Sequence, residues 1–374
     1  MDADFANSGS GYFVLGNGTF DTYSANVNLT NTGSRNMYFA YNGPGHSVSG
    51  NLTATNSGTG TSGIYIGSGN TSTLSINGNI ALTQNGTGTT LNTYLGDQGD
   101  ITANGTVTLV NSGTGITSEM RIANNMNSAV TIFGATSITN NNTALTTNRI
   151  YAGENGDITF NGTLDLINNA GSNNSEIYCN NRANSTNIYN ENITIQTTNA
   201  SSDGIRFGQN GGTGTLAATK TITIGAGGFI AGDLQFRNFT QTGNTSQSLV
   251  CTGLARIYNY DSNWGGDVSF IAPRNITRGT FYNRTAYIEK TGASDDQSIG
   301  GNTFSMDVDF VNSGSGYLMM GNGTFDTYSA NVNLTNTGSR HMYFAYNGPG
   351  HSVSGNLTAT NSGTGTSGVY IGSG

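Results

Sequence analysis

Four pairs of acidic residues are the groups whose types and spacing come nearest to catalytic chemistry. Enzymes that cleave polysaccharides need clustered carboxylates, together with Lys, Arg or His, on one face of the fold. The first two pairs lie in equivalent Gly-containing turns, where Asp and Gly serve turn geometry. The pairs are Asp97/Asp100, Glu154/Asp157, Asp295/Asp296 and Asp307/Asp309.

The three histidines offer these carboxylates no general base. His46 and His351 are the same position of a long repeat, and His341 stands where the other copy of the repeat has Asn36. An exchange of Asn for His suits a solvated position rather than a general base. We therefore expect no catalytic residue and no enzymatic activity.

Metal binding is the second chemistry that the acidic turns could support. Carboxylate and carbonyl oxygens bind calcium, but the chain lacks the calcium-binding nonapeptide repeat, and solvated turns are the favoured interpretation. Cys179 and Cys251 are far apart and show neither C-x-x-C nor Cys/His spacing. We expect no metal site, no cofactor and no disulfide framework.

A stripe of aromatic and basic residues alternates with apolar residues at similar places along the chain. Three interpretations remain open for it. The side chains could stiffen a sheet by cross-strand pairing, form a lateral interface between copies of the chain, where Tyr and Arg are favoured, or contact glycans. The stripe comprises Tyr65, Arg121, Tyr151, Tyr178, Arg206, Gln235, Tyr258 and Tyr287.

Short strands must position these side chains. Of the 374 residues, 56 are Gly and only 34% are hydrophobic, and a Gly-rich polar composition with few core residues is typical of disorder. Pro is nearly absent, however, and runs such as NVNLT, GTVTLV and NGTLDLI alternate apolar and polar residues with the period of a strand. No helical pattern longer than a turn or two occurs. The sequence therefore predicts an all-β fold.

A short repeat organises the strands into coils. The phrase NSGTG and its variants recur at 7, 31, 56, 85 and 111, and more degenerate forms follow. The spacing predicts rungs of roughly 24–30 residues in a parallel β-solenoid, also called a β-helix. Between about 229 and 300 the pattern is ragged and predicts no rung register. Ile64, Ile66, Ile177, Ile205 and Phe207 are expected to point into the core.

Gly and Asn mark the corners of these coils. Both tolerate left-handed backbone, which sharp corners require. Stacked Asn side chains are expected to hydrogen-bond to one another from coil to coil.

A much longer repeat contains the short one. Residues 1–69 return as residues 306–374, so one unit spans 1–305 and the next begins at 306. We expect one continuous solenoid that is a segment of a longer tandem array. The seven differences are Ala3/Val308, Ala6/Val311, Phe13/Leu318, Val14/Met319, Leu15/Met320, Asn36/His341 and Ile64/Val369.

Three longer phrases carry a resemblance to a known class of proteins. GTGTLAATKTITIGAGGFIAGDLQFRNFTQTGNTSQSLVCTG (212–253), GTFYNRTAYIEKTGASDDQSIGGNTF (279–304) and VNSGSGYLMMGNGTFD (311–326) occur in order. Together they resemble the repeats of giant surface proteins that gliding Bacteroidota export by type IX secretion. The grappling-hook filaments of predatory marine members are the nearest in kind. The resemblance offers no catalytic motif to carry over.

The resemblance implies an extracellular, cell-surface filament or stalk for adhesion, motility or prey capture. The expected partners are further copies of the chain, and surface glycans or a prey cell surface. The net charge of −8 argues against nucleic acid, and no apolar run is long enough for membrane insertion. A carbohydrate-binding β-helix module is the alternative function.

Overall fold

The computed structural model describes residues 1–142, 147–171, 174–348 and 350–372. Strands are the only regular secondary structure in these ranges, and their parallel sheets stack as a β-solenoid. The predicted fold class is confirmed. None of the described residues forms a helix long and apolar enough to cross a membrane. Two compact units divide the chain, Met1–Gly214 and Thr215–Gly374, whereas the sequence repeat restarts at Met306.

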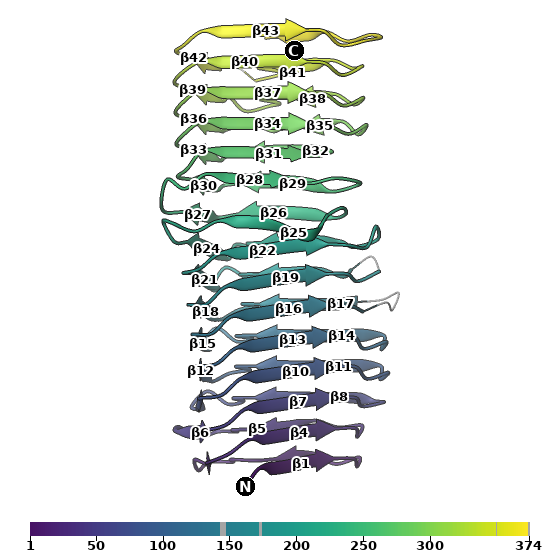
Figure 1. Ribbon diagram of the computed structural model, residues 1–374, viewed down its shortest axis with the longest axis vertical. Coiled ribbons are helices and arrows are strands. Elements are labelled where there is room, and N and C mark those ends of the chain that lie inside the picture. Colours follow the sequence, from purple (N-terminus) through teal and green to yellow (C-terminus); the bar gives the residue numbers. More distant parts are fainter. Residues whose placement is uncertain (143–146, 172–173, 349, 373–374) are drawn as a thin grey trace. The chain divides into compact units, whose positions relative to one another are not determined.

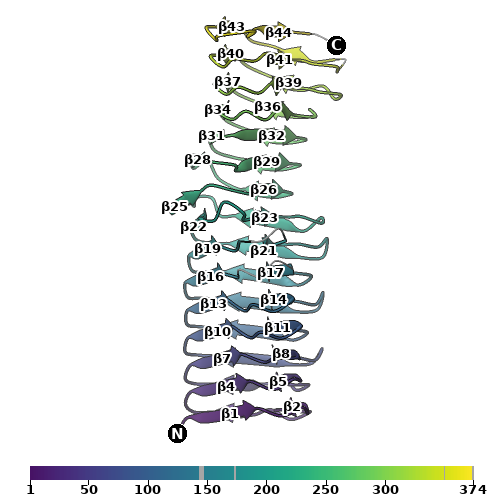
Figure 2. The same cartoon turned by 90° about the vertical axis from the view of Figure 1, so that its right-hand side faces the viewer.

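Each coil of the first unit contributes one strand to each of three sheets (Figures 1 and 2). In spatial order the first sheet contains β1 (Ala3–Asn7), β4 (Val27–Asn31), β7 (Leu52–Asn56), β10 (Ile80–Gln84), β13 (Val107–Asn111), β16 (Thr136–Asn140), β19 (Leu164–Asn168) and β22 (Ile193–Thr197). The second contains β2 (Phe13–Val14), β5 (Met37–Phe39), β8 (Thr61–Ile66), β11 (Thr90–Leu95), β14 (Thr117–Ile122), β17 (Thr147–Ala152), β20 (Ile177–Cys179) and β23 (Gly204–Phe207). The third contains β3 (Thr22–Tyr23), β6 (His46–Val48), β9 (Thr73–Ile76), β12 (Asp100–Ala103), β15 (Ala129–Ile132), β18 (Asp157–Phe160) and β21 (Thr186–Tyr189); β24 (Thr213–Leu216) contains the division between the units.

The second unit has the same three-sided plan. One side holds β25 (Ile222–Phe229), β28 (Gln247–Val250), β31 (Val268–Ala272), β34 (Ala286–Lys290), β37 (Val308–Asn312), β40 (Val332–Asn336) and β43 (Leu357–Asn361). Another holds β26 (Asp233–Arg237), β29 (Arg256–Tyr260) and β32 (Arg274–Arg278), and a separate sheet of β35 (Asp296–Gln297), β38 (Leu318–Met319), β41 (Met342–Phe344) and β44 (Val369–Ile371). The third side holds β27 (Phe239–Gln241), β30 (Asn263–Trp264), β33 (Phe281–Tyr282), β36 (Thr303–Phe304), β39 (Thr327–Tyr328) and β42 (Ser352–Val353).

Coil length changes along the chain. In the first unit Ala3 pairs with Val27 and Val107 pairs with Thr136, and both separations fall within the predicted range. In the second unit Val268 pairs with Ala286, which makes this coil shorter than the repeat predicts. The predicted coil length is therefore wrong for part of the ragged region. There, Pro273 alone separates β31 from β32, so the corner phrase that marks the period is missing.

The core is a column of apolar side chains from successive coils. Ile64, Ile66, Ile177, Ile205 and Phe207 have no exposed surface, which confirms their predicted inward orientation. Burial of each such side chain contributes about 1.5–3 kcal/mol. Stability is therefore spread over many equivalent positions along the stack.

Buried Asn residues form a ladder at the corner that follows the first sheet. Asn31, Asn56 and Asn111 occupy this position and are fully buried. The Asn31 amide donates to the carbonyl of Arg35 in its own coil at 2.9 Å and to that of Gly63 in the next coil at 2.9 Å. The expected side-chain ladder is thus mainly a ladder to backbone carbonyls. These bonds matter because a buried, unpaired carbonyl is costly.

An exposed Asn ladder caps the corner between the third and first sheets. The Oδ1 atom of Asn26 accepts the backbone N–H of Asn51 at 2.8 Å, and Oδ1 of Asn51 accepts the N–H of Asn79 at 2.8 Å. Each side chain thus binds the backbone of the following coil.

Candidate functional site

The predicted stripe is a continuous column on the second sheet of the first unit. The strand register aligns Tyr65, Arg121, Tyr151, Tyr178 and Arg206 as predicted, and it adds two tyrosines. We call this set the aromatic–arginine column. In order its members are Tyr38, Tyr65, Tyr94, Arg121, Tyr151, Tyr178 and Arg206.

Sequence reasoning missed Tyr38 and Tyr94. The signal that could have found them is local, because TYLG around Tyr94 has the same pattern as IYIG around Tyr65. The register Tyr65↔Tyr94 places the two rings 4.8 Å apart, edge to face. The column therefore has no gap between Tyr38 and Arg121.

Arginine side chains lie over the tyrosine rings of this column. The guanidinium carbon of Arg121 lies 5.2 Å from the ring centroid of Tyr94 and 5.0 Å from that of Tyr151. Tyr151 and Tyr178 stack at 5.2 Å with an angle of 12° between their planes. Cation–π contacts of this kind contribute about 0.5–1 kcal/mol at exposed sites and more where water is excluded.

The column faces outward, but its rings expose little surface. Tyr94, Tyr151 and Tyr178 are 8%, 6% and 7% exposed, because the coils on both sides and flanking side chains cover them. Rings packed in this way stiffen the sheet along its axis. Of the three interpretations, this geometry best supports cross-strand pairing, and it leaves mainly ring edges and half-buried guanidinium groups for a partner.

Carboxylates balance the charge of the column. An Nη atom of Arg121 lies 2.6 Å from a carboxylate oxygen of Glu119, and Glu176 lies 3.0 Å from Nε of Arg149 and 3.7 Å from Arg206. Burial raises the pKa of Tyr151 to about 12. Tyr151 therefore stays neutral over the physiological range.

In the second unit the predicted stripe is only partly formed. Gln235 and Tyr258 are register partners on β26 and β29, and the next position is Ile276. Tyr287 lies on β34, where it pairs with Ser269 and Asp309. Its assignment to the stripe is therefore wrong. Apolar and polar residues alternate in β34 as they do in the strands of the second sheet, and the shortened coil made the register impossible to read from the sequence.

Two acidic turns are buried rather than solvated. Asp97 is 7% exposed and accepts hydrogen bonds from the Ser68 hydroxyl at 2.9 Å and the Asn124 amide at 2.8 Å. Burial raises the pKa of the Asp97 carboxyl. Glu154 is 4% exposed and binds Arg182 at 3.0 Å. The expectation of solvated turns is wrong for both residues, since neighbouring coils cover them.

The second acid of each pair has a different role. Asp100 accepts the backbone N–H of Ala129 at 2.9 Å, and Asp157 accepts that of Thr186 at 2.8 Å, each in the following coil. The described part of the chain contains no group of three or more His, Cys, Asp or Glu that could hold a metal ion. The two hydrogen bonds to the following coil make Asp100 and Asp157 corner caps.

The histidines are likewise part of the packing. Nδ1 of His46 accepts the backbone N–H of Asp21 at 3.1 Å, and His351 repeats this bond to Asp326 at 3.0 Å. His341 is half-buried and its ring lies 4.9 Å from that of Tyr370. The expectation of a solvated position for His341 is thus only half met.

Both cysteines are free and buried in the described structure. Burial raises the pKa of each thiol, Cys179 and Cys251, to about 12. Neither is poised as a nucleophile.

The candidate residues are thus part of a stacked repeat, in which most of their polar side chains bind groups of neighbouring coils. Comparison of the chain with models of known protein families, with curated proteins and with solved structures gave no match.

Proposed function

We propose that this chain is a structural segment of a giant extracellular filament or stalk at the cell surface, which mediates attachment or prey capture. The role is mechanical and non-enzymatic. Parallel backbone ladders hold each coil on the next, and the length of the array sets the reach. The resemblance of the long phrases to type IX-secreted surface proteins of gliding Bacteroidota supports the location.

One observation carries the proposal. The second copy of the repeat rebuilds the same coil with the same register, since Ala3 pairs with Val27 and Val308 pairs with Val332. The separation between partners is identical in the two copies. A sequence that returns to the same coil after 305 residues can be repeated without a change of architecture, which is what a tandem structural element requires.

The chemistry of the ionisable side chains supports a role without catalysis. Asp97 and Glu154 are occupied by hydrogen bonds, and His46 is buried against a backbone N–H. The proposed partners are further copies of the chain, which would meet through the exposed edges of the aromatic–arginine column. Surface glycans or a prey cell surface are the proposed targets.

Cryo-electron microscopy of surface material from the producing cell tests this proposal. Antibodies against the chain should label filaments at regular intervals, and the cross-section should show one solenoid or a symmetric bundle. A bundle with the column at its contacts would support lateral assembly. Labelling confined to the cell interior, or to particles without filaments, would contradict the proposal.

A further inference from the structure

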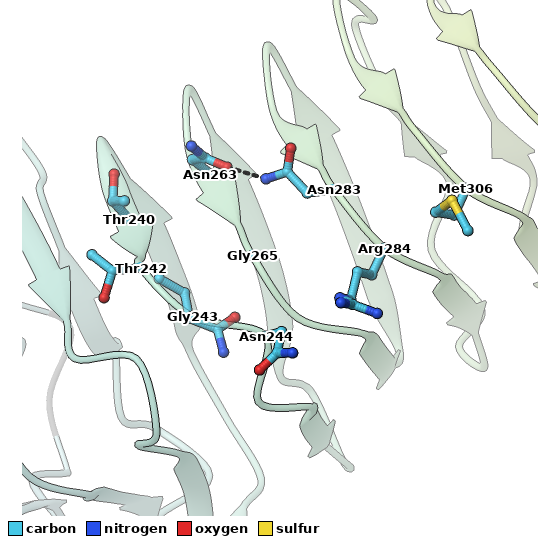
Figure 3. A pocket seen from close by; sticks show the side chains of 10 residues that line it. Thr240, Thr242, Gly243, Asn244, Asn263, Gly265, Asn283, Arg284 and Met306 are labelled. Atoms are coloured by element: carbon cyan, nitrogen blue, oxygen red, sulfur yellow. Dashed lines mark hydrogen bonds between the residues drawn. The ribbon is translucent and has the colours of Figure 1, made fainter.

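The second unit has a polar groove on the side of its third sheet (Figure 3). Its volume is about 760 Å³. The groove lies within the ragged part of the sequence, where coils are shortest. Its walls include Thr242, Asn244, Asn263, Asn283, Arg284 and Met306.

Two glycines, Gly243 and Gly265, line the groove on neighbouring coils. A Cβ atom on Gly265 would lie 2.2 Å from the Gly243 carbonyl oxygen. The close approach of the two coils therefore requires glycine at this position. Ala286 and Val308 are register partners, so Arg284 and Met306, each two residues earlier, occupy the same corner position of the next two coils.

A longer corner forms one wall. Residues 242–246 join β27 to β28, whereas only residues 265–267 join β30 to β31 in the next coil. Figure 3 shows Asn244 on the longer corner and Arg284 pointing back toward it. The groove thus runs across successive coils, from Thr240 to Met306. Three steps of about 4.8 Å give it a length of about 14 Å.

Arg284 is the only charged residue among those that line the groove. The side chain is exposed, and its guanidinium makes no hydrogen bond to any residue that the structure describes. The hydrogen bond from the Thr285 hydroxyl lowers the pKa of Asp267, and the positive charge of Arg284 adds a smaller effect, but Asp267 lies outside the lining. Arg offers planar, paired donors that suit a carboxylate.

Amides and an aromatic ring continue this surface. The Asn283 amide donates to Oδ1 of Asn263 at 2.5 Å, which orients both side chains. The Asn263 amide N–H groups and Oδ1 of Asn283 have no partners among the described residues, so these two lining residues keep one donor group and one acceptor group free for a ligand. Phe281 is the register partner of Asn263 and is 52% exposed. It lies on the same face of its strand as Asn283.

We propose that this groove binds a short acidic oligosaccharide, a chain of sugars that carries uronate carboxylates. Arg284 pairs with a carboxylate, Asn263 and Asn283 bind hydroxyl groups, and the Phe281 ring packs against a sugar face. This inference goes beyond the mechanical role, because binding to the groove does not depend on filament formation.

Isothermal titration calorimetry of the full chain with hexamers of galacturonate, mannuronate and guluronate tests the proposal by measuring the affinity for each. We expect at least one hexamer to bind, with affinity that falls as salt is added. Arg284→Gln should weaken binding about tenfold or more, because a charge-assisted pair is lost. Arg278→Gln, at another exposed arginine of the second unit, is the matched control and should bind as the parent does.

Three outcomes would overturn the proposal. The first is that none of the three hexamers binds. The second is that the neutral hexamer maltohexaose binds as tightly as the best of them. The third is that Arg284→Gln and Arg278→Gln lose affinity equally. Melting curves of both variants should match that of the parent, since both side chains are exposed. Filament formation is measured separately. Failure of the groove to bind these hexamers would therefore leave the mechanical proposal unaffected, and failure of the mechanical proposal would leave the groove proposal unaffected.

Discussion

His46 is held in one tautomer by Asp21, because its Nδ1 atom accepts the Asp21 backbone N–H at 3.1 Å. The proton of the neutral ring must then reside on Nε2, which is buried and has no partner. Protonation at Nδ1 would place two donors against each other. The same hydrogen bond recurs from the Asp326 backbone N–H to Nδ1 of His351, so each copy of the repeat contains this corner.

The first prediction is that acid loosens this corner. Burial lowers the pKa of His46 below its ordinary value of 6.5, although the Asp21 carboxylate opposes this shift. The unfolded state therefore binds the proton more readily, and this contribution to stability is complete above pH 6.5 and declines as the pH falls below it. Hydrogen exchange of residues 16–23 should show lower protection at pH 5.5 than at pH 7.5, after correction for intrinsic rates.

Two variants separate this effect from other titrations. His46→Gln should remove most of the pH dependence in residues 16–23. His341→Asn is the matched control, because Asn36 is the natural residue at that position of the first copy, and it should leave that dependence unchanged. Equal pH dependence in the His46 variant and the parent would refute the assignment.

The second prediction concerns the buried Asn ladder. Asn111→Ala should lower the free energy of unfolding by about 1–3 kcal/mol. The buried Ser118 hydroxyl loses its acceptor, Oδ1 of Asn111, and keeps only the bond that the Gln84 amide donates to it, while the Ser118 carbonyl loses the Asn111 amide. Urea denaturation measures the loss. Asn104→Ala removes an exposed bond to Asn77 and should change stability by less than about 0.5 kcal/mol. Equal losses would mean that burial of the ladder is not decisive.

The third prediction concerns the aromatic–arginine column. Arg121→Met keeps the aliphatic stem but removes the charge between Tyr94 and Tyr151, and should cost about 1 kcal/mol in urea denaturation. Arg35→Met is the control, because exposed Arg35 contacts a single exposed ring, Tyr12, at 5.7 Å. A neutral result for Arg121 would show that ring-to-ring packing alone maintains the column.

The fourth prediction is that both thiols are inert in the folded chain. Cys179 and Cys251 are buried, with the pKa of each thiol raised to about 12. Labelling by Ellman's reagent at pH 8 should be at least about 100-fold slower than in guanidinium chloride. Ser10→Cys, at an exposed position, provides an accessible thiol for comparison. Rapid labelling of the native parent would reveal local opening.

The sequence predicted the coil because strand alternation and corner phrases are local patterns. Ile64 and Ile66 alternate with Tyr65, and that alternation alone assigns the first two to the core and the third to the outer face. The position of Tyr287 could not be predicted in the same way. Alternation assigns a face of a strand but does not say to which sheet the strand belongs.

Burial of polar groups was also beyond local patterns. Asp97 lies in a turn rich in Gly and Asp, yet Ser68 and Asn124 from the adjacent coils bind its carboxylate. Those partners are 29 and 27 residues away, and they become neighbours only when the coil lengths are known. The groove lined by Gly243 and Gly265 depends on the same information, because adjacent corners of different length form its walls.

The pairing of each coil with the next also determines how the chain can fold. The partner of Val107 is Thr136, and that of Val268 is Ala286, so pairing never waits for a distant segment in these coils. Loop closure over such short separations is rapid, and folding of low contact order can proceed from one end. A chain that emerges from a narrow exit would thus be able to fold vectorially, with each completed coil serving as the template for the one behind it.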